Sequence, residues 1–176
     1  MRCFLAIELN EEMKGELVKI QKEFQDYLTA KFVEKENLHL TLKFFPDVDE
    51  KDINDIKKSL KELEFGKFSM ILGKIGFFPN ENRINVVWAS LESEKIGELH
   101  ELIEVKLTDF VKEKNFESHV TLARVKNIKN KEKFLEKVKN FNVKPVSFEV
   151  KNFILKKSTL TEKGPIYEDI ERFELF

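Results

Sequence analysis

The chain has 176 residues, a length typical of a single domain with its own hydrophobic core. Its 31 lysine and arginine residues nearly balance 32 aspartate and glutamate residues. The resulting net charge of −1 excludes a protein that binds nucleic acid through bulk positive charge, but not a local basic cleft. The single cysteine, Cys3, excludes an internal disulfide and a cysteine-based metal motif. The apolar run from Cys3 to Ile7 is too short for a signal peptide or a membrane span, so we expect a cytoplasmic protein.

The first part of the chain alternates predicted strands and helices. Apolar periodicity predicts a strand over residues 2–9, a helix over 11–28, a strand over 36–45, a helix over 50–63, and strands over 67–78 and 83–91. Asn10 and Asp49 precede the two helices, and their short side chains are suited to accept hydrogen bonds from the free N–H groups of a first helical turn.

The second part repeats this order of elements. We expect a helix capped by Ser93 and apolar as far as Phe110, a strand over 117–125, a helix over about 130–141, a strand-like run over 146–158 and a last strand over 166–176. Each part reads strand, helix, histidine-containing strand, helix, strand. This predicts one domain over residues 1–176 with an internal duplication, the approximate repeats being 1–78 and 83–156.

Two apolar strand segments carry the same polar pattern, histidine followed two residues later by threonine. His39 and Thr41 lie in ENLHLTLKFF, and His119 and Thr121 lie in ESHVTLARV. Because side chains alternate faces along a strand, each histidine shares a face with its threonine, with Cα atoms roughly 6.5–7 Å apart. A single histidine on a strand is usually an ordinary surface or core residue. Two of the three histidines in equivalent places favour a functional pair.

These residue types fit acid–base chemistry on a phosphate. Histidine can hold or release a proton near neutral pH, so two histidines facing one substrate can act as acid and base. Threonine hydroxyls can donate hydrogen bonds to phosphoryl oxygens. The expected site lacks a nucleophilic side chain, because strict alternation turns Ser118, the neighbour of His119, to the other face of its strand. This favours phosphodiester cleavage by water. The glycine spacing matches no phosphate-binding loop, so we expect no nucleotide cofactor, and acid–base chemistry by the two histidines needs no metal.

Strict alternation also assigns neighbouring residues to faces. It places Lys43 and Phe45 on the His39 face, where they would add a positive charge and a base-stacking ring. It places Arg124 on the opposite face from His119, so a β-bulge would be needed to turn it inward. We expect His100 on the surface of its helix and Trp88 in the core.

At these residues the sequence resembles the two-histidine phosphoesterase superfamily and, more narrowly, the RNA 2′,3′-cyclic phosphodiesterases, also called 2′-5′ RNA ligases. The resemblance covers essentially the whole chain and rests on residues 2–9, 36–45, 73–91, 119–125 and 155–175. It implies a bilobal α+β fold in which two antiparallel sheets face a central cleft, with helices packed outside. Each lobe would contribute one histidine-containing strand.

The resemblance also implies a reaction and the residues that perform it. A 2′,3′-cyclic phosphate at an RNA 3′ end would be opened to a 2′-phosphomonoester, together with reversible 2′-5′ RNA ligation. His39 would protonate the leaving oxygen and His119 would accept the proton of water, although the residues alone do not assign these two roles. Thr41 and Thr121 would bind the non-bridging oxygens.

The family-like tail and the second motif supply further expected substrate contacts. These are Arg124, Ser158 and Tyr167. The implied partner is RNA with a 2′,3′-cyclic phosphate end, tRNA fragments included, and neither a membrane nor a protein partner is implied. A monomer suffices because the duplication supplies both halves of the site.

Two other functions remain open at this point. A metal-dependent phosphodiesterase could use His39, His119 and a carboxylate such as Glu36, which would leave the threonines without a role. A non-catalytic RNA-end-binding module could keep the cleft without turnover.

Overall fold

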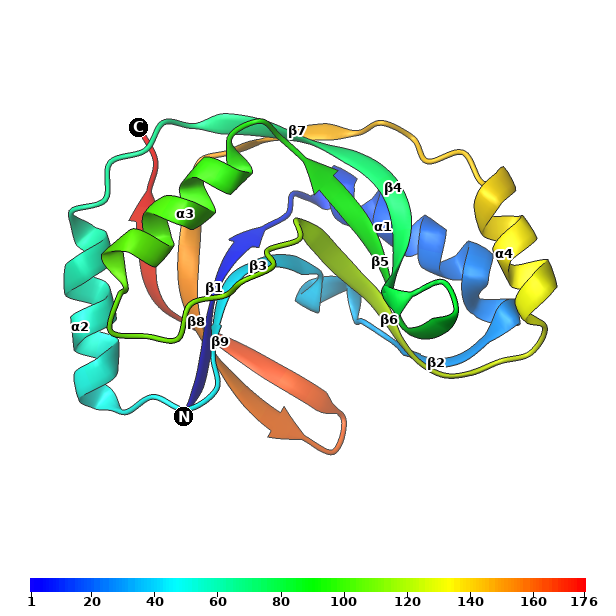
Figure 1. The fold of residues 1–176 in the computed structure, drawn as a ribbon, viewed down its shortest axis with the longest axis horizontal. Helices are drawn as coiled ribbons and strands as arrows, with labels where there is room; N and C mark the ends of the chain where they lie inside the picture. Colours follow the sequence, from blue (N-terminus) through cyan, green and yellow to red (C-terminus); the bar gives the residue numbers. More distant parts are fainter.

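The computed structural model describes all residues from 1 to 176 (Figure 1). The strands are β1 (Arg2–Glu8), β2 (Leu28–Phe32), β3 (His39–Phe45), β4 (Phe68–Asn80), β5 (Arg83–Glu92), β6 (His119–Ile128), β7 (Ser147–Val150), β8 (Asn152–Thr161) and β9 (Gly164–Glu174). The helices are α1 (Glu11–Phe24), α2 (Glu50–Lys61), α3 (Ile96–Lys106) and α4 (Lys131–Asn140), with short 3₁₀ turns at Gln25–Tyr27 and Lys35–Asn37. No helix is both long and apolar enough to pass through a membrane.

The helix starts follow the capping residues, with one exception. Asn10 accepts a hydrogen bond from the Met13 amide, and Asp49 forms a reciprocal capping box with Asp52. The prediction that Ser93 caps the third helix is wrong: α3 begins two residues later, after Lys95, and the Ser93 hydroxyl accepts a hydrogen bond from the Lys95 amide instead.

Three predicted elements differ from the structure by more than a few residues. The first helix ends at Phe24 rather than Leu28, because residues 28–32 form β2 and pair with β6. The third helix ends at Lys106, short of Phe110. The predicted run over 146–158 is two strands, β7 and β8, which join opposite ends of the sheet. The formation of β2 and the separation of β7 from β8 depend on pairing with strands that are distant in the sequence. Local periodicity carries no information about this pairing.

The strands form one curled antiparallel sheet with a narrow waist. The strand order is β7-β4-β5-β6-β3-β1-β8-β9, with β2 paired to β6. We call β3, β1, β8 and β9 the first half-sheet, and β6, β5, β4, β7 and β2 the second half-sheet. They are joined by a single residue pair, Leu40 with Val120. The expected α+β fold with antiparallel strands and outer helices is confirmed, and its two sheets are continuous at this point.

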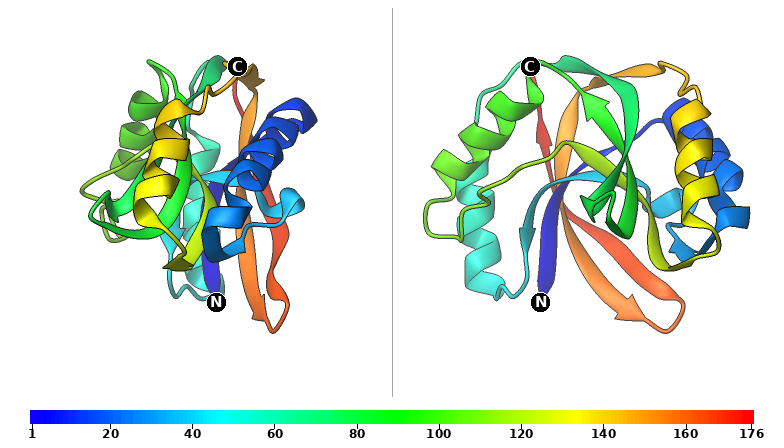
Figure 2. Two further views of the ribbon diagram at one scale, coloured as in Figure 1. Left: turned by 90° about the vertical axis from the view of Figure 1, so that its right-hand side faces the viewer. Right: turned by 45° about the vertical axis from the view of Figure 1, so that its right-hand side comes forward.

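The helices cover the outer side of the curled sheet, and each half of the chain contributes to both half-sheets. In Figures 1 and 2, α2 and α3 lie beside the first half-sheet, and α1 and α4 lie beside the second. Gln21 of α1 donates hydrogen bonds to carbonyls of Val33 and Leu122, next to β2 and on β6. In the sheet, β4 from the first half of the chain pairs with β5 from the second half, and β8 from the second half pairs with β1 from the first. The half-sheets are therefore not residues 1–78 and 83–156.

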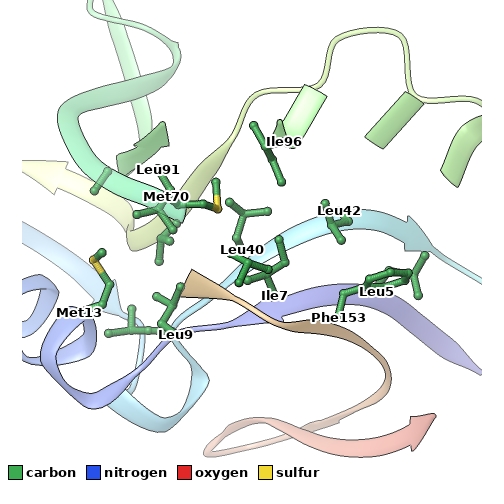
Figure 3. Close-up of a cluster of buried hydrophobic side chains, with 14 of the residues drawn as sticks. Leu5, Ile7, Leu9, Met13, Leu40, Leu42, Met70, Leu91, Ile96 and Phe153 are labelled. Atoms are coloured by element: carbon green, nitrogen blue, oxygen red, sulfur yellow. The ribbon is translucent and has the colours of Figure 1, made fainter. Parts of the chain in front are cut away.

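The hydrophobic core continues from one half-sheet into the other. A single cluster of 40 buried residues spans the molecule, so the two half-sheets share one core. Figure 3 shows Leu40 and Leu42 of β3 in this cluster, near Ile7 of β1 and Met70 of β4. Both leucines are fully buried, and alternation therefore turns His39 and Thr41 toward the opposite, concave face, as predicted.

Candidate active site

Both histidine-containing strands lie at the waist of the sheet, where they are direct neighbours. His39 and Thr41 are the neighbours of Leu40 in β3, and His119 and Thr121 are the neighbours of Val120 in β6. Because Leu40 pairs with Val120, the two motifs lie side by side. All four side chains line one cavity of about 400 Å³. The predicted convergence of the two motifs is thus present, although the two histidines lie far apart in the chain.

The two imidazoles are held in the same way. His39 Nδ1 lies 2.6 Å from the carbonyl oxygen of Asn37, and His119 Nδ1 lies 2.7 Å from that of Glu117. A carbonyl can only accept, so in the neutral ring Nδ1 carries the hydrogen and Nε2 keeps a free lone pair. His39 Nε2 lies 3.0 Å from the Thr41 hydroxyl. In both rings Nε2 is therefore the atom available for proton transfer.

Aromatic rings surround both imidazoles, from different strands. The His39 ring lies 4.9 Å from Phe4 and 5.4 Å from Tyr167, measured between centroids. The His119 ring lies 4.9 Å from Phe78 and 5.8 Å from Trp88. The indole of Trp88 in turn lies over Gly76, where any side chain would clash with it.

This packing shifts the acid–base equilibria of both histidines. Burial lowers the pKa of His39 to about 4, and the positive charge of Lys156 acts in the same direction. Burial also lowers the pKa of His119, against the opposing effects of the Glu117 carbonyl and carboxylate. Both imidazoles are consequently neutral near pH 7 in the ligand-free protein.

The cavity is positively charged because two arginines line it and no acidic residue offsets their charge. Of its 14 lining residues none is aspartate or glutamate, although the chain has 32 of them. Arg2 and Arg124 line it together with the two histidines. The structure thus provides the local basic cleft that the near-zero net charge left open, and the cavity suits an anion.

A β-bulge follows the threonine in both motifs. In β3 the register with β1 skips Leu42, and in β6 the register with β5 skips Leu122. Two successive residues therefore turn toward the core in each strand, and the fifth residue after each histidine turns back into the cleft. In β6 this residue is Arg124, so the bulge that its predicted inward orientation required is present.

The same bulge corrects the prediction for Lys43. Its side chain is fully buried on the core side, where Nζ lies 2.8 Å from Glu104 Oε1 and 2.7 Å from the Val111 carbonyl oxygen. Lys43 is therefore not a substrate contact. It connects β3 to α3 and to the segment that follows α3.

Phe45 is corrected for the same reason. It is buried and packs its ring against Phe110, with centroids 5.3 Å apart. Phe44, assigned by strict alternation to the core, lines the cavity instead and lies under the guanidinium of Arg2. The sequence contained no local signal for this exchange, because a bulge is a property of strand pairing.

Of the remaining predicted contacts, Ser158 and Tyr167 both line the cavity from β8 and β9. His100 is not on the surface: it is buried, and its ring stacks on Phe116 at 4.1 Å. Trp88 is buried, as predicted. Sequence reasoning did not identify the other lining residues, which are Arg2, Phe4, Val33, Asn37, Phe44, Leu160 and Pro165.

The residues do not form a metal-ligand set. Glu36, the carboxylate considered for a metal site, does not line the cavity. No group of three or more histidine, cysteine, aspartate or glutamate side chains is placed to hold a metal ion. The donor set at the two histidines thus fits proton transfer better than metal coordination.

Comparisons with known proteins find similarity along almost the whole chain. The family model described as LigT like Phosphoesterase matches residues 7–88 and 91–167. A protein of Methanocaldococcus jannaschii named RNA 2′,3′-cyclic phosphodiesterase is 40% identical over 176 residues, covering 98% of this chain and 100% of that protein. A protein of Archaeoglobus fulgidus with the same name is 36% identical over 180 residues, covering 99% and 100%.

Solved structures share the fold along the whole chain. A crystal structure of a Thermus thermophilus protein matches with a TM-score of 0.82 and 30% identity, covering 99% of this chain and 97% of that one. The Escherichia coli LigT complexed with 3′-AMP matches with a TM-score of 0.80 and 22% identity, again covering 99% and 97%.

Proposed function

Because the chain belongs to the LigT-like phosphoesterase family, we propose that it hydrolyses the 2′,3′-cyclic phosphate at the 3′ end of RNA to a 2′-phosphomonoester. Full-length relatives at 36% and 40% identity carry the name RNA 2′,3′-cyclic phosphodiesterase. The observation that carries the proposal is the pair of imidazoles, His39 and His119. Both are fixed through Nδ1 and both line one cavity without acidic residues.

The proposed reaction is a single displacement at phosphorus. His119 Nε2 removes a proton from water as the water oxygen attacks phosphorus. The bond between phosphorus and the 3′ oxygen breaks, and protonated His39 gives its Nε2 proton to that oxygen. The 2′-phosphomonoester leaves with a free 3′-hydroxyl. Proton exchange with solvent then restores both histidines.

Substrate binding prepares His39 for the role of acid. Its pKa of about 4 means that the ligand-free ring rarely carries a proton at neutral pH. A phosphodiester anion between the two rings raises this pKa, because a nearby negative charge favours the imidazolium. The protonated state is therefore formed together with the substrate complex.

The other polar groups of the cavity would stabilise the transition state. Thr41 and Thr121 can donate hydrogen bonds to the non-bridging oxygens, and Arg124 can neutralise the charge that develops on them. Loss of one such donor typically costs about 10²–10³-fold in rate. In ligation the 5′-hydroxyl of a second RNA would take the place of water, so His119 would remove its proton and His39 would again protonate the 3′ oxygen. The two roles exchange only in the reverse reaction, in which the 3′-hydroxyl cleaves the 2′-5′ linkage.

The product isomer tests this proposal. We expect an oligoribonucleotide with a 2′,3′-cyclic end to give a 2′-phosphate, identified by ³¹P NMR. A tRNA fragment with the same end would show whether longer natural ends are also accepted. Exclusive formation of a 3′-phosphate, or no turnover of any cyclic end, would contradict the proposal.

A further inference from the structure

The cavity is large enough for one nucleotide, and the rest of an RNA substrate must lie across its rim. A volume of about 400 Å³ is near the lower limit of ordinary ligand pockets. The reacting cyclic phosphate occupies the part of it between the two histidines. The nucleotide that precedes the cyclic end therefore contacts residues at the edge of the cavity.

The tip of the β8–β9 hairpin forms one part of this edge. The hairpin extends beyond the other strands, with its tip residues between Thr161 and Gly164 (Figures 1 and 2). Its inward-facing residues Leu160 and Pro165 pair with each other and line the cavity. The Leu160 side chain is 62% exposed. An aliphatic side chain that is open to solvent at a site opening is available to pack against a base.

The hairpin tip is held in place from both sides. Gly164 adopts a φ of +120°, which favours glycine, and its carbonyl accepts a hydrogen bond from the Thr161 hydroxyl. Asn37, next to β3, donates a hydrogen bond to the Pro165 carbonyl oxygen at 3.3 Å. The apolar surface at the tip is therefore positioned before any substrate arrives.

A lysine without an acidic partner lies beside this tip. Lys31 of β2 is paired directly with Arg124 of β6, so both cations project from the same face of the sheet. A methyl group at Gly164 would lie 3.4 Å from Lys31 Nζ. Neither Lys31 nor Arg124 has a carboxylate within 4.0 Å. Two like charges directly opposite each other destabilise a sheet, and an anion between them removes this cost.

The opposite edge of the cavity is less suited to a phosphate. There the guanidinium of Arg2 lies over the Phe44 ring, 5.4 Å from its centroid. The Phe44 amide donates a hydrogen bond to Glu113, which places a carboxylate at that end. Of these two edges, the one at Arg2 and Phe44 has a carboxylate bound to its backbone, whereas no carboxylate lies within 4.0 Å of Lys31.

We propose that Lys31, Leu160 and Pro165 form a binding subsite for the nucleotide that precedes the cyclic end of RNA. Lys31 contacts the phosphate between this nucleotide and the terminal one, and the Leu160–Pro165 surface packs against its base. This inference rests on the proposed function and names the part of the substrate that a cyclic mononucleotide lacks.

The test compares two substrates, a 2′,3′-cyclic mononucleotide and a tetraribonucleotide with the same cyclic end. The measured quantity is the ratio of kcat/KM for the tetranucleotide to kcat/KM for the mononucleotide. We expect Leu160→Ala to lower this ratio several-fold, on the scale of about fourfold for each methyl group removed from the contact. We expect Lys31→Gln to lower it as well. The same substitution should make the salt dependence of the tetranucleotide reaction shallower by about 0.7 in log–log slope.

Matched controls lie on the outer face of the same hairpin. Ile166 is 55% exposed and pairs with Thr159, whereas Lys157 pairs with the buried Cys3. Ile166→Ala and Lys157→Gln should leave the ratio as it is in the unmodified protein. Equal ratios for Leu160→Ala, Lys31→Gln and these controls would overturn the subsite. If the unmodified protein hydrolysed neither substrate, the proposed function itself would fail, and the two failures are thus distinguishable.

Discussion

The two histidine-containing strands share a backbone and differ in their surroundings. In both β3 and β6 the histidine Nδ1 bonds to the carbonyl two residues earlier, and a bulge follows the threonine. The residue that the bulge turns into the cleft is Phe44 in β3 and Arg124 in β6. The buried residue before it is a lysine in β3 and an alanine in β6. One backbone arrangement thus places an aromatic ring on one side of the cleft and a cation on the other.

The electrostatic environment differs as well. Lys156 bridges Glu8 and Asp169 near His39, and its charge helps to lower the pKa of His39. Next to His119, the Glu117 carboxylate raises the pKa of that histidine and opposes the effect of burial. A repeated motif can therefore supply two different chemical roles, because the neighbours of each copy set its proton affinity.

The largest expected effect separates the acid from the base. His39→Ala and His119→Ala should each lower kcat about 10²–10⁴-fold on a cyclic phosphate, since each removes one proton transfer. A substrate in which sulfur replaces the 3′ oxygen does not need a proton on its leaving group. On this analogue His39→Ala should recover most of its lost activity in a stopped-flow assay, whereas His119→Ala should not. Recovery by His119→Ala alone would reverse the assignment.

The second effect concerns Lys43, the buried lysine of β3, whose place in β6 is taken by an alanine. Lys43→Met leaves the Glu104 carboxylate buried without its cation, with only His100 Nε2 near it at 3.5 Å. We expect the free energy of unfolding, measured in urea, to fall by about 3–5 kcal/mol. The double variant Lys43→Met/Glu104→Gln should regain a large part of this loss, and Lys157→Met, at a lysine outside any ion pair, should change little. A loss below about 1 kcal/mol would show that the ion pair adds little to the attachment of β3 to α3.

The smallest effect is the response of stability to pH. The folded-state pKa of His39, about 4, lies below its ordinary value of 6.5. Above pH 6.5 the ring is neutral in both states, and below it the unfolded chain binds the proton first. The free energy of unfolding therefore falls as the pH is lowered from the ordinary pKa to the folded-state pKa, by up to about 3 kcal/mol. Chemical denaturation of His39→Asn should show a flatter pH profile than that of His119→Asn. Parallel profiles would contradict this prediction, because they would mean that folding lowers the pKa of both histidines equally.

Local sequence was sufficient to predict the pair of motifs and most of the helix starts, whereas the fold class was expected from the family resemblance. Alternation along a strand is local, so HLTL and HVTL place their histidine and threonine opposite the buried leucines in any half-buried sheet. Caps at Asn10 and Asp49 are likewise local, because each side chain accepts a hydrogen bond from a backbone amide three residues ahead.

Long-range strand pairing, by contrast, selects which neighbours of the motifs reach the cleft. Lys43, Phe45 and Arg124 all lie beyond the bulge, and a bulge arises from pairing with β1 or β5, segments far away in the chain. The burial of His100 and the formation of β2 depend in the same way on segments that meet after folding. The site opening likewise brings together Lys31, Asn37 and the hairpin tip. A strand pattern fixes which way a side chain points relative to its own backbone, whereas long-range register fixes what it meets there.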